Sequence, residues 1–406
     1  MKKFLSVLLV FSLLLSSALF SCENKPDNKD DGDEKEKEPA RELTEEEKAI
    51  MDEVIFLMED DTYDTDELIG KFFGDFYVDR FDGSDLPYSK IYKVGDVLAI
   101  EYKNNETNYQ IVKDSKLCTV TRTNDGAKLH LSSNEDYPYS YPLSVFTAFG
   151  VDMSSVYSTE ESTEEEPKVT YDSLTVSKDK KSVTFSDDYL KEVAKFICTA
   201  FEPTEKELNK FLDEMSASGV FTLDDQSAKF SFEGVMGDLG SIKMETSFSY
   251  KDKKPASLTS SITLTMESDG VPVTTTQENI IRNMEYENDE LVSLTVESRN
   301  LTNSKATQNG VTVDYSTSVI GVYDFILENS APATLNVMVN ANQTISYAGQ
   351  KQESSSSLTL FVKDNNLTYD LSANGLQQAY IAAEGFTFST PENVTIPEDI
   401  YTVLPK

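Results

Sequence analysis

The feature that most constrains the fold is a period-two alternation of apolar and polar residues from residue 219 to the end of the chain. Between residues 242 and 250, for example, Ile242, Met244 and Phe248 alternate with lysine, glutamate and serine. Residues two apart point to the same side of a β-strand, so this pattern predicts strands with one buried and one wet face. The same pattern recurs at 258–266, 292–296, 311–315, 335–341, 358–362, 367–371 and 386–388.

Turn-forming pairs separate these segments, and they include Asp269-Gly270, Asn309-Gly310, Asn365-Asn366 and Asn374-Gly375. Such pairs favour tight turns between antiparallel strands. The sequence therefore predicts a mainly β (α+β) fold. It consists of a large, curved antiparallel sheet, or an open barrel or sandwich, of amphipathic strands with a few covering helices.

The first half of the chain adds helices and shorter strands. Thr44 and Glu47 form a capping box, which predicts a helix from about residue 45 to 59. A second helix is expected over 64–77, and a helix pair begins at Asp187 and Thr204. Short strands are expected between residues 91 and 185. We expect residues 44–186 and 187–406 to be two domains or one continuous domain.

Composition excludes several classes of function. The chain has 71 acidic residues, 36 lysines and arginines, and a formal net charge of −35, which argues against a nucleic-acid partner. It has one histidine and three cysteines, which is too few for a multi-site zinc protein. The histidine, His130, is expected to face solvent. Because no catalytic motif accompanies it, we predict no enzymatic activity, no metal and no cofactor.

The first 22 residues predict an anchor. Lys2 and Lys3 precede the uncharged stretch 4–20, which is typical of a signal peptide. The sequence Leu19-Phe20-Ser21-Cys22 then resembles the lipobox of bacterial lipoproteins. This resemblance implies that residues 1–21 are a signal peptide cleaved between Ser21 and Cys22. It also implies that lipid is attached to Cys22 and holds the protein on a membrane.

Residues 22–43 are predicted to be a lipidated, acidic and disordered tether, because they contain almost no apolar side chains. Their acidic residues also resemble signals that send lipoproteins to the bacterial cell surface. The candidate export-signal residues are Asp27, Asp30, Asp31, Asp33 and Glu34. We expect the protein on the outer membrane or cell surface, with a periplasm-facing position as the alternative.

Three functions remain open for the body. The first is a non-enzymatic binding or structural role, with an apolar ligand held between sheet and helices and lined by Phe211, Met215 and Met244. The order of helix, strands, helix pair and strands is similar to that of lipid-carrying lipoproteins. The second is an adhesion or assembly module that binds a protein or glycan, for which 137–141 supplies three tyrosines. The third is a hydrolase that uses two carboxylates.

Overall fold

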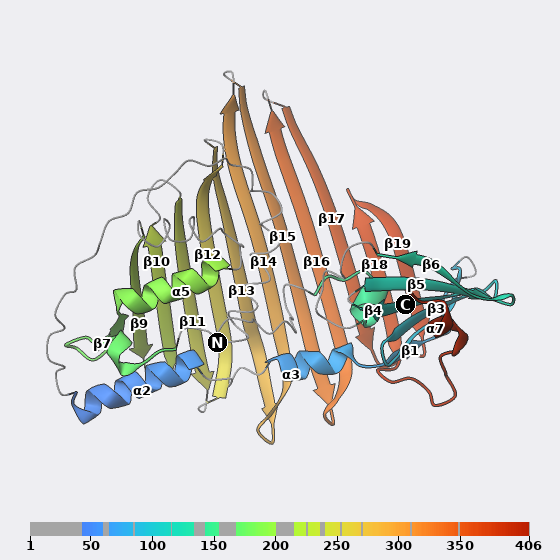
Figure 1. The fold of residues 1–406 in the computed structure, drawn as a ribbon, viewed down its shortest axis with the longest axis horizontal. Helices are drawn as coiled ribbons and strands as arrows, with labels where there is room; N and C mark the ends of the chain where they lie inside the picture. The colour runs from blue at the N-terminus through green and yellow to red at the C-terminus, as the bar shows by residue number, and fades with distance from the viewer. Residues whose placement is uncertain are drawn as a thin grey trace.

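The computed structural model confirms a mainly β fold with antiparallel sheets and few helices (Figure 1). Neither of its two sheets closes on itself. The structure describes residues 43–59, 65–83, 86–114, 116–133, 143–153, 168–199, 215–224, 226–235, 240–251, 254–268, 271–308, 311–347 and 350–405.

The larger sheet has thirteen strands, and each strand pairs with its neighbours in the sequence. This order is the simplest way to bury one face of consecutive amphipathic strands that are joined by short turns. The strands are β7 Leu174–Val176, β8 Ser182–Phe185, β9 Ser216–Asp224, β10 Ser227–Val235, β11 Gly240–Lys251, β12 Lys254–Ser268, β13 Val271–Glu287, β14 Glu290–Gln308, β15 Val311–Glu328, β16 Ala331–Tyr347, β17 Gln350–Lys363, β18 Asn366–Ala373 and β19 Leu376–Glu384.

The smaller sheet has six strands, which also pair in sequence order. They are β1 Phe76–Val78, β2 Tyr88–Val94, β3 Val97–Tyr102, β4 Thr107–Lys113, β5 Lys116–Thr123 and β6 Gly126–Ser132. The helices and helical turns are α2 Glu45–Glu59, α3 Thr65–Gly70, η1 Lys71–Phe73, α4 Val145–Ala148, η2 Tyr171–Ser173, α5 Asp187–Thr199 and α7 Asp399–Thr402. Strands β7 and β8 precede residue 187 and belong to the same sheet as β9–β19.

The two sheets are joined at one seam. Tyr77 pairs with Thr387 and Phe81 pairs with Ala383, both antiparallel. Both pairs fit one antiparallel register, because Phe81 follows Tyr77 by four positions and Ala383 precedes Thr387 by four positions. The chain around β1 therefore continues the edge of the larger sheet next to the end of β19. From this seam the smaller sheet folds back over the larger one, as the right-hand side of Figure 1 shows.

Three clusters of buried side chains hold the layers together. One joins the larger sheet to α3, η1, α4 and the smaller sheet, with Phe72, Leu98 and Leu335 at its centre. A second packs α2 and α5 against strands β7–β11. In a third, Ile400 near the C-terminus covers the other face of the smaller sheet. All these helices and the smaller sheet cover one face of the larger sheet, which we call the inner face.

The local predictions are mostly confirmed, with two corrections. The predicted strand at 386–388 is absent as a strand, and only Thr387 forms an isolated bridge there. Helix α2 begins after a capping box, in which the Glu47 amide donates to Thr44 Oγ1 at 3.2 Å and the Thr44 amide donates to Glu47 Oε2 at 2.9 Å. The prediction of one helix over 64–77 is wrong in its second half. Helical structure ends at Phe73, Gly74 is extended with ψ −172°, and β1 begins at Phe76.

Candidate functional site

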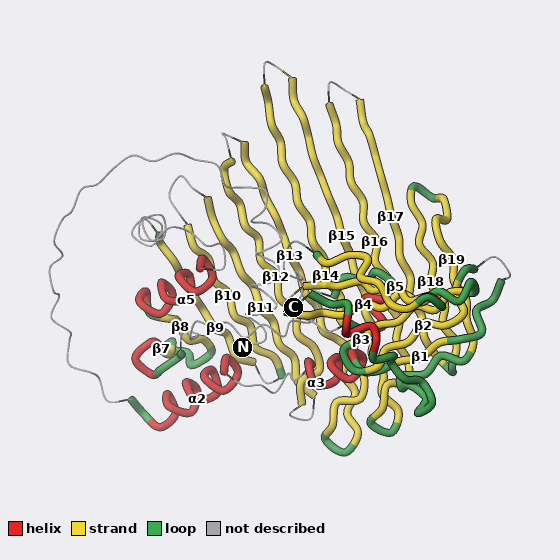
Figure 2. The backbone as a smooth tube through the Cα atoms, turned by 45° about the vertical axis from the view of Figure 1, so that its right-hand side comes forward, coloured by secondary structure: helices red, strands yellow, loops and turns green. Residues whose placement is uncertain are grey.

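The most distinctive exposed surface is the outer face of the central strands, which is the face opposite the covering helices and the smaller sheet. Strands β13–β17 contain between 14 and 19 residues each, and their upper ends extend beyond the covering helices in Figure 1. The inner face is buried near Val296 and Tyr323. Val319 lies on the same face of β15, four residues before Tyr323, and is 42% exposed. At this end, side chains on both faces of the sheet are accessible, and Figure 2 shows the strands standing clear.

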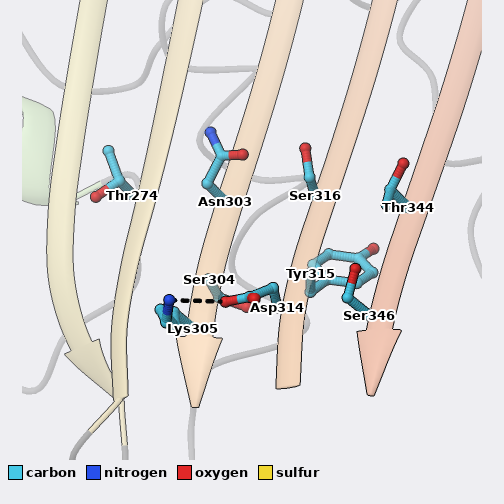
Figure 3. A pocket seen from close by; sticks show the side chains of 9 residues that line it. All are labelled: Thr274, Asn303, Ser304, Lys305, Asp314, Tyr315, Ser316, Thr344 and Ser346. Carbon is cyan, nitrogen blue, oxygen red and sulfur yellow. Dashed lines mark ion pairs between the residues drawn. The ribbon is translucent and has the colours of Figure 1, made fainter. Parts of the chain in front are cut away.

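A polar depression of about 360 Å³ lies at this end of the sheet (Figure 3). One row of its side chains crosses four strands, because Thr274 pairs with Asn303, Asn303 with Ser316, and Ser316 with Thr344. The adjacent row contains Lys305, Asp314 and Ser346. Because side chains alternate along a strand, both rows lie on the outer face. Ser304 and Tyr315 also line the depression, but they occupy the positions between the two rows on β14 and β15.

Side chains in the depression keep hydrogen-bonding capacity that neighbouring hydroxyls have used. Next to it, Thr263 and Thr276 pair at 3.1 Å, and at its edge the lining residue Thr274 pairs with Thr265 at 3.2 Å. By contrast, no hydrogen bond joins the side chains of Asn303, Ser316, Thr344 or Ser346 to another residue in the described part of the chain. These groups are free to exchange donors and acceptors with a ligand or with water.

The charge in the depression is balanced. Lys305 Nζ lies 3.4 Å from Asp314 Oδ1, and the two side chains are 67% and 53% exposed. Such an exposed pair contributes little stability, so both groups can also contact a ligand. The site therefore suits a ligand that is polar, on balance uncharged, and rich in hydroxyl or amide groups.

A charged network occupies the same face nearer the helices. Glu297 lies between two arginines, 3.1 Å from Arg282 and 2.6 Å from Arg299, and Arg299 also contacts Glu278 at 2.9 Å. The hydrogen bond to Glu297 raises the pKa of the Arg299 guanidinium above its ordinary value. Because Glu297 is itself buried among these partners, the network is satisfied internally and fixes the register of β13 and β14.

The described carboxyl groups with a displaced pKa do not fit the role of a general acid. Hydrogen bonds from Lys229, Lys254 and Lys71 lower the pKa of Glu245, Asp289 and Glu290, respectively. A general acid at neutral pH needs a raised pKa instead. Among the described residues, no group of three or more His, Cys, Asp or Glu side chains could hold a metal ion.

The single histidine and the cysteines lie apart from this surface. His130 is exposed on β6, as predicted, but its neighbour Leu129 is also exposed, at 38%, because the β5–β6 register shifts here and leaves His130 without a pairing partner on β5. Cys118 is buried in the smaller sheet, and the side chain of Cys198 lies outside the described part. Helices in the described part include none that is both long and apolar enough to cross a membrane.

The structure places two of the three predicted ligand-lining residues. Met244 is 6% exposed and lies in the cluster beneath α2 and α5, and Met215 is 7% exposed just before β9. Phe211 lies outside the described residues. So do the tyrosines of 137–141 and the predicted cleavage, lipidation and export residues, which are Ser21, Cys22, Asp27, Asp30, Asp31, Asp33 and Glu34.

The polar depression was not predicted from the sequence. The sequence does show that the solvent face of the strands is rich in serine and threonine, but this signal runs along the whole sheet. Only the strand register brings Thr274 next to Asn303 and Ser316 next to Thr344.

Comparison with known proteins adds no relative to this description. The chain matches no family model, and no curated protein or solved structure is significantly similar to it.

Proposed function

We propose that the chain is a lipid-anchored extracytoplasmic protein of the bacterial outer membrane or cell surface, with a binding role and no enzymatic activity. The lipobox-like Leu19-Phe20-Ser21-Cys22 supports the anchor. The observation that carries the binding role is the polar depression, whose side chains face solvent with unused hydrogen-bonding capacity.

The ligand class follows from the lining of this depression. Its seven outer-face side chains are hydroxyls, an amide and one balanced ion pair, and none of them is apolar. Glycan hydroxyls both donate and accept hydrogen bonds, so they complement such groups. Adjacent strands are about 4.8 Å apart, so the row from Thr274 to Thr344 spans roughly 14 Å and can contact several sugars of an extended chain. This favours adhesion to a neutral glycan.

The proposal that an apolar ligand lies between sheet and helices has less support from the described residues. Met244 packs there among Phe221, Phe232 and Leu190, all of them buried. Close packing of this kind is what a core requires. Native mass spectrometry of the purified protein tests that version, because a resident lipid would add its mass to the protein ion.

The anchor is tested by Cys22→Ala, because the sulfur of this residue is the expected acyl acceptor. We expect the variant to lose the acyl mass and to leave the membrane fraction. Two or more acyl chains are needed for stable anchoring, so release should be nearly complete. Cys118→Ala is the matched control and should stay acylated and membrane-bound. Unchanged membrane retention of unacylated Cys22→Ala would show that another segment anchors the chain.

The binding role is tested by replacing Asn303 and Ser316 together with alanine. Loss of two hydrogen bonds of about 1 kcal/mol each predicts roughly 30-fold weaker binding to neutral glycans on an array. The control replaces Ser355 and Ser357 with alanine. These two serines lie two positions apart on the same face of β17, outside the depression. Binding of no neutral glycan, or equal binding by both double variants, would contradict the assignment of this surface.

A further inference from the structure

Two large aromatic side chains are exposed on the outer face of the larger sheet, in its last three strands. Phe361 on β17 is 40% exposed, and Tyr380 on β19 is 51% exposed. Both lie on the outer face, because their neighbours Leu360 and Ile381 are buried in the core cluster of the inner face. Aromatic rings exposed in this way are more typical of an interface than of a solvated sheet face.

A carboxylate lies between these two rings. Asp370 on β18 is directly opposite Tyr380, and Thr368, two residues earlier on the same face, is directly opposite Phe361. Strands are about 4.8 Å apart and rise about 3.4 Å per residue, so the Cα atoms of Phe361 and Tyr380 are roughly 12 Å apart. A group bound midway, next to Asp370, is therefore within reach of both rings.

The Asp370 carboxylate is held in place and keeps acceptor capacity. Its Oδ1 accepts a hydrogen bond from Ser372 Oγ at 3.1 Å, and its Oδ2 accepts one from Gln377 Nε2 at 2.7 Å. Each carboxylate oxygen has two lone pairs, so each can accept one more hydrogen bond. Among the described residues, no lysine or arginine forms an ion pair with Asp370.

The local charge favours a cation. Asp82 is exposed beside β19, where its amide donates to the carbonyl oxygen of Ala382 at 2.7 Å. Of the cations nearby, Arg80 already contacts two acidic side chains. Lys363 lies four positions along β17 from the residue that pairs with Asp370, which places their Cα atoms roughly 14 Å apart. This separation exceeds the Debye length of about 8 Å at physiological salt, so Lys363 does not neutralise Asp370.

We propose that the surface formed by Phe361, Asp370 and Tyr380 is a docking site for an arginine side chain of a partner protein. A guanidinium stacks on aromatic faces and donates two parallel hydrogen bonds to one carboxylate, which an ammonium group cannot do. Met338 is 38% exposed one row away from Phe361 on the same face, and it extends the apolar surface for residues that flank the arginine.

A second copy of the chain is a poor source of this arginine. The described arginines each form an ion pair already, and they are Arg80, Arg122, Arg282 and Arg299. The net charge of −35 also opposes self-association and attracts a basic partner. The site is separate from the polar depression, because Asn336, which pairs with Phe361, is eight positions along β16 from Thr344. It depends on neither glycan binding nor the lipid anchor.

The test uses the full-length protein in detergent at physiological salt, with two synthetic peptides of equal length. One alternates arginine with serine, and the other alternates lysine with serine. Both carry the same charge, so general attraction to an acidic protein affects them equally. We expect calorimetry to show that the arginine peptide binds about five-fold more tightly or better.

Two pairs of variants locate the site. Asp370→Asn should weaken binding of the arginine peptide about ten-fold or more. Glu353→Gln removes the same charge from an exposed position further along β17, and it should keep binding within about two-fold. Phe361→Leu combined with Tyr380→Leu should weaken binding about five-fold, whereas Tyr347→Leu, exposed at the end of β16, should not change it.

If Asp370→Asn does not fold, the two peptides and the ring variants decide. Equal binding of both peptides, or equal losses in Asp370→Asn and Glu353→Gln, would mean that only general charge attraction acts, and it overturns the proposal. A dimer of the full-length chain that Asp370→Asn dissociates would place an arginine of a second copy in the site and overturn the assignment to a partner.

Discussion

Gly385 lies where β19 passes into the seam between the two sheets, with φ at +75°. A left-handed residue costs little as glycine and about 1–2 kcal/mol more with a side chain. Space is also short here, because a Cβ on Gly385 would lie 2.5 Å from Asp79 Oδ1 and 2.7 Å from Arg80 Nη2. The residue therefore meets two requirements at once, one of the backbone and one of the packing.

A pair of alanine variants separates these two requirements. Gly375 has the same φ of +75°, but its Cβ would meet nothing within 4 Å. We expect Gly375→Ala to lower the free energy of unfolding by about 1 kcal/mol, and Gly385→Ala by about 2–3 kcal/mol. Urea denaturation measures both. Equal losses would mean that the side chains of Asp79 and Arg80 move aside at no cost.

At the scale of single elements, periodicity predicted most strands because each buries one face over many residues. In β11, for instance, Ile242, Met244 and Thr246 are buried while Lys243 and Ser247 are exposed. Helix α2 was equally predictable, since the Thr44–Glu47 capping box is a local signal. Local chemistry and burial point to the same element in these cases.

The end of the second helix shows where periodicity fails. Leu68, Ile69, Phe72, Phe73 and Phe76 fit one helical face, yet only the first four lie in helical structure. Phe76 and Val78 also fit the alternation of a strand, and both are fully buried in β1. A short apolar run satisfies both periods, so the pairing of β1 with β2 decides between them.

The candidate site was less predictable than the strands because it depends on register between strands. Thr274 and Thr344 are far apart in the sequence and belong to one row only through the pairings of β14 and β15. The network around Glu297 has the same origin, because Arg282 reaches it from β13. Register is set by the summed packing of the inner face, which no single segment reveals.

At the scale of the whole molecule, buried tyrosines at and near the seam between the sheets make the stability of the fold depend on pH. Tyr77 lies in β1, pairs with Thr387 across the seam and donates a hydrogen bond to Asp79 Oδ2 at 3.2 Å. Burial, with the nearby Asp79 charge second, raises the pKa of Tyr77 from 10.0 to about 12. Burial also raises the pKa of Tyr92 in β2 and of Tyr109 in β4 of the same sheet.

These shifts predict loss of stability in alkali. A phenol whose pKa is higher in the folded chain loses its proton first in the unfolded chain, so ionisation favours unfolding. The stability that Tyr77 contributes is complete below pH 10 and is lost as the pH rises to about 12. Circular dichroism should therefore show unfolding in this range, together with the absorbance change of ionised tyrosine.

Substitution at the seam should move this transition. Tyr77→Phe keeps the ring and removes the ionisable group, so unfolding should require a higher pH than in the native protein. Tyr347→Phe is the matched control, because Tyr347 is 56% exposed at the end of β16, away from the seam, and it should leave the midpoint unchanged. If every tyrosine ionised near pH 10 while the sheets stayed intact, burial at the seam would not be coupled to the stability of the whole molecule.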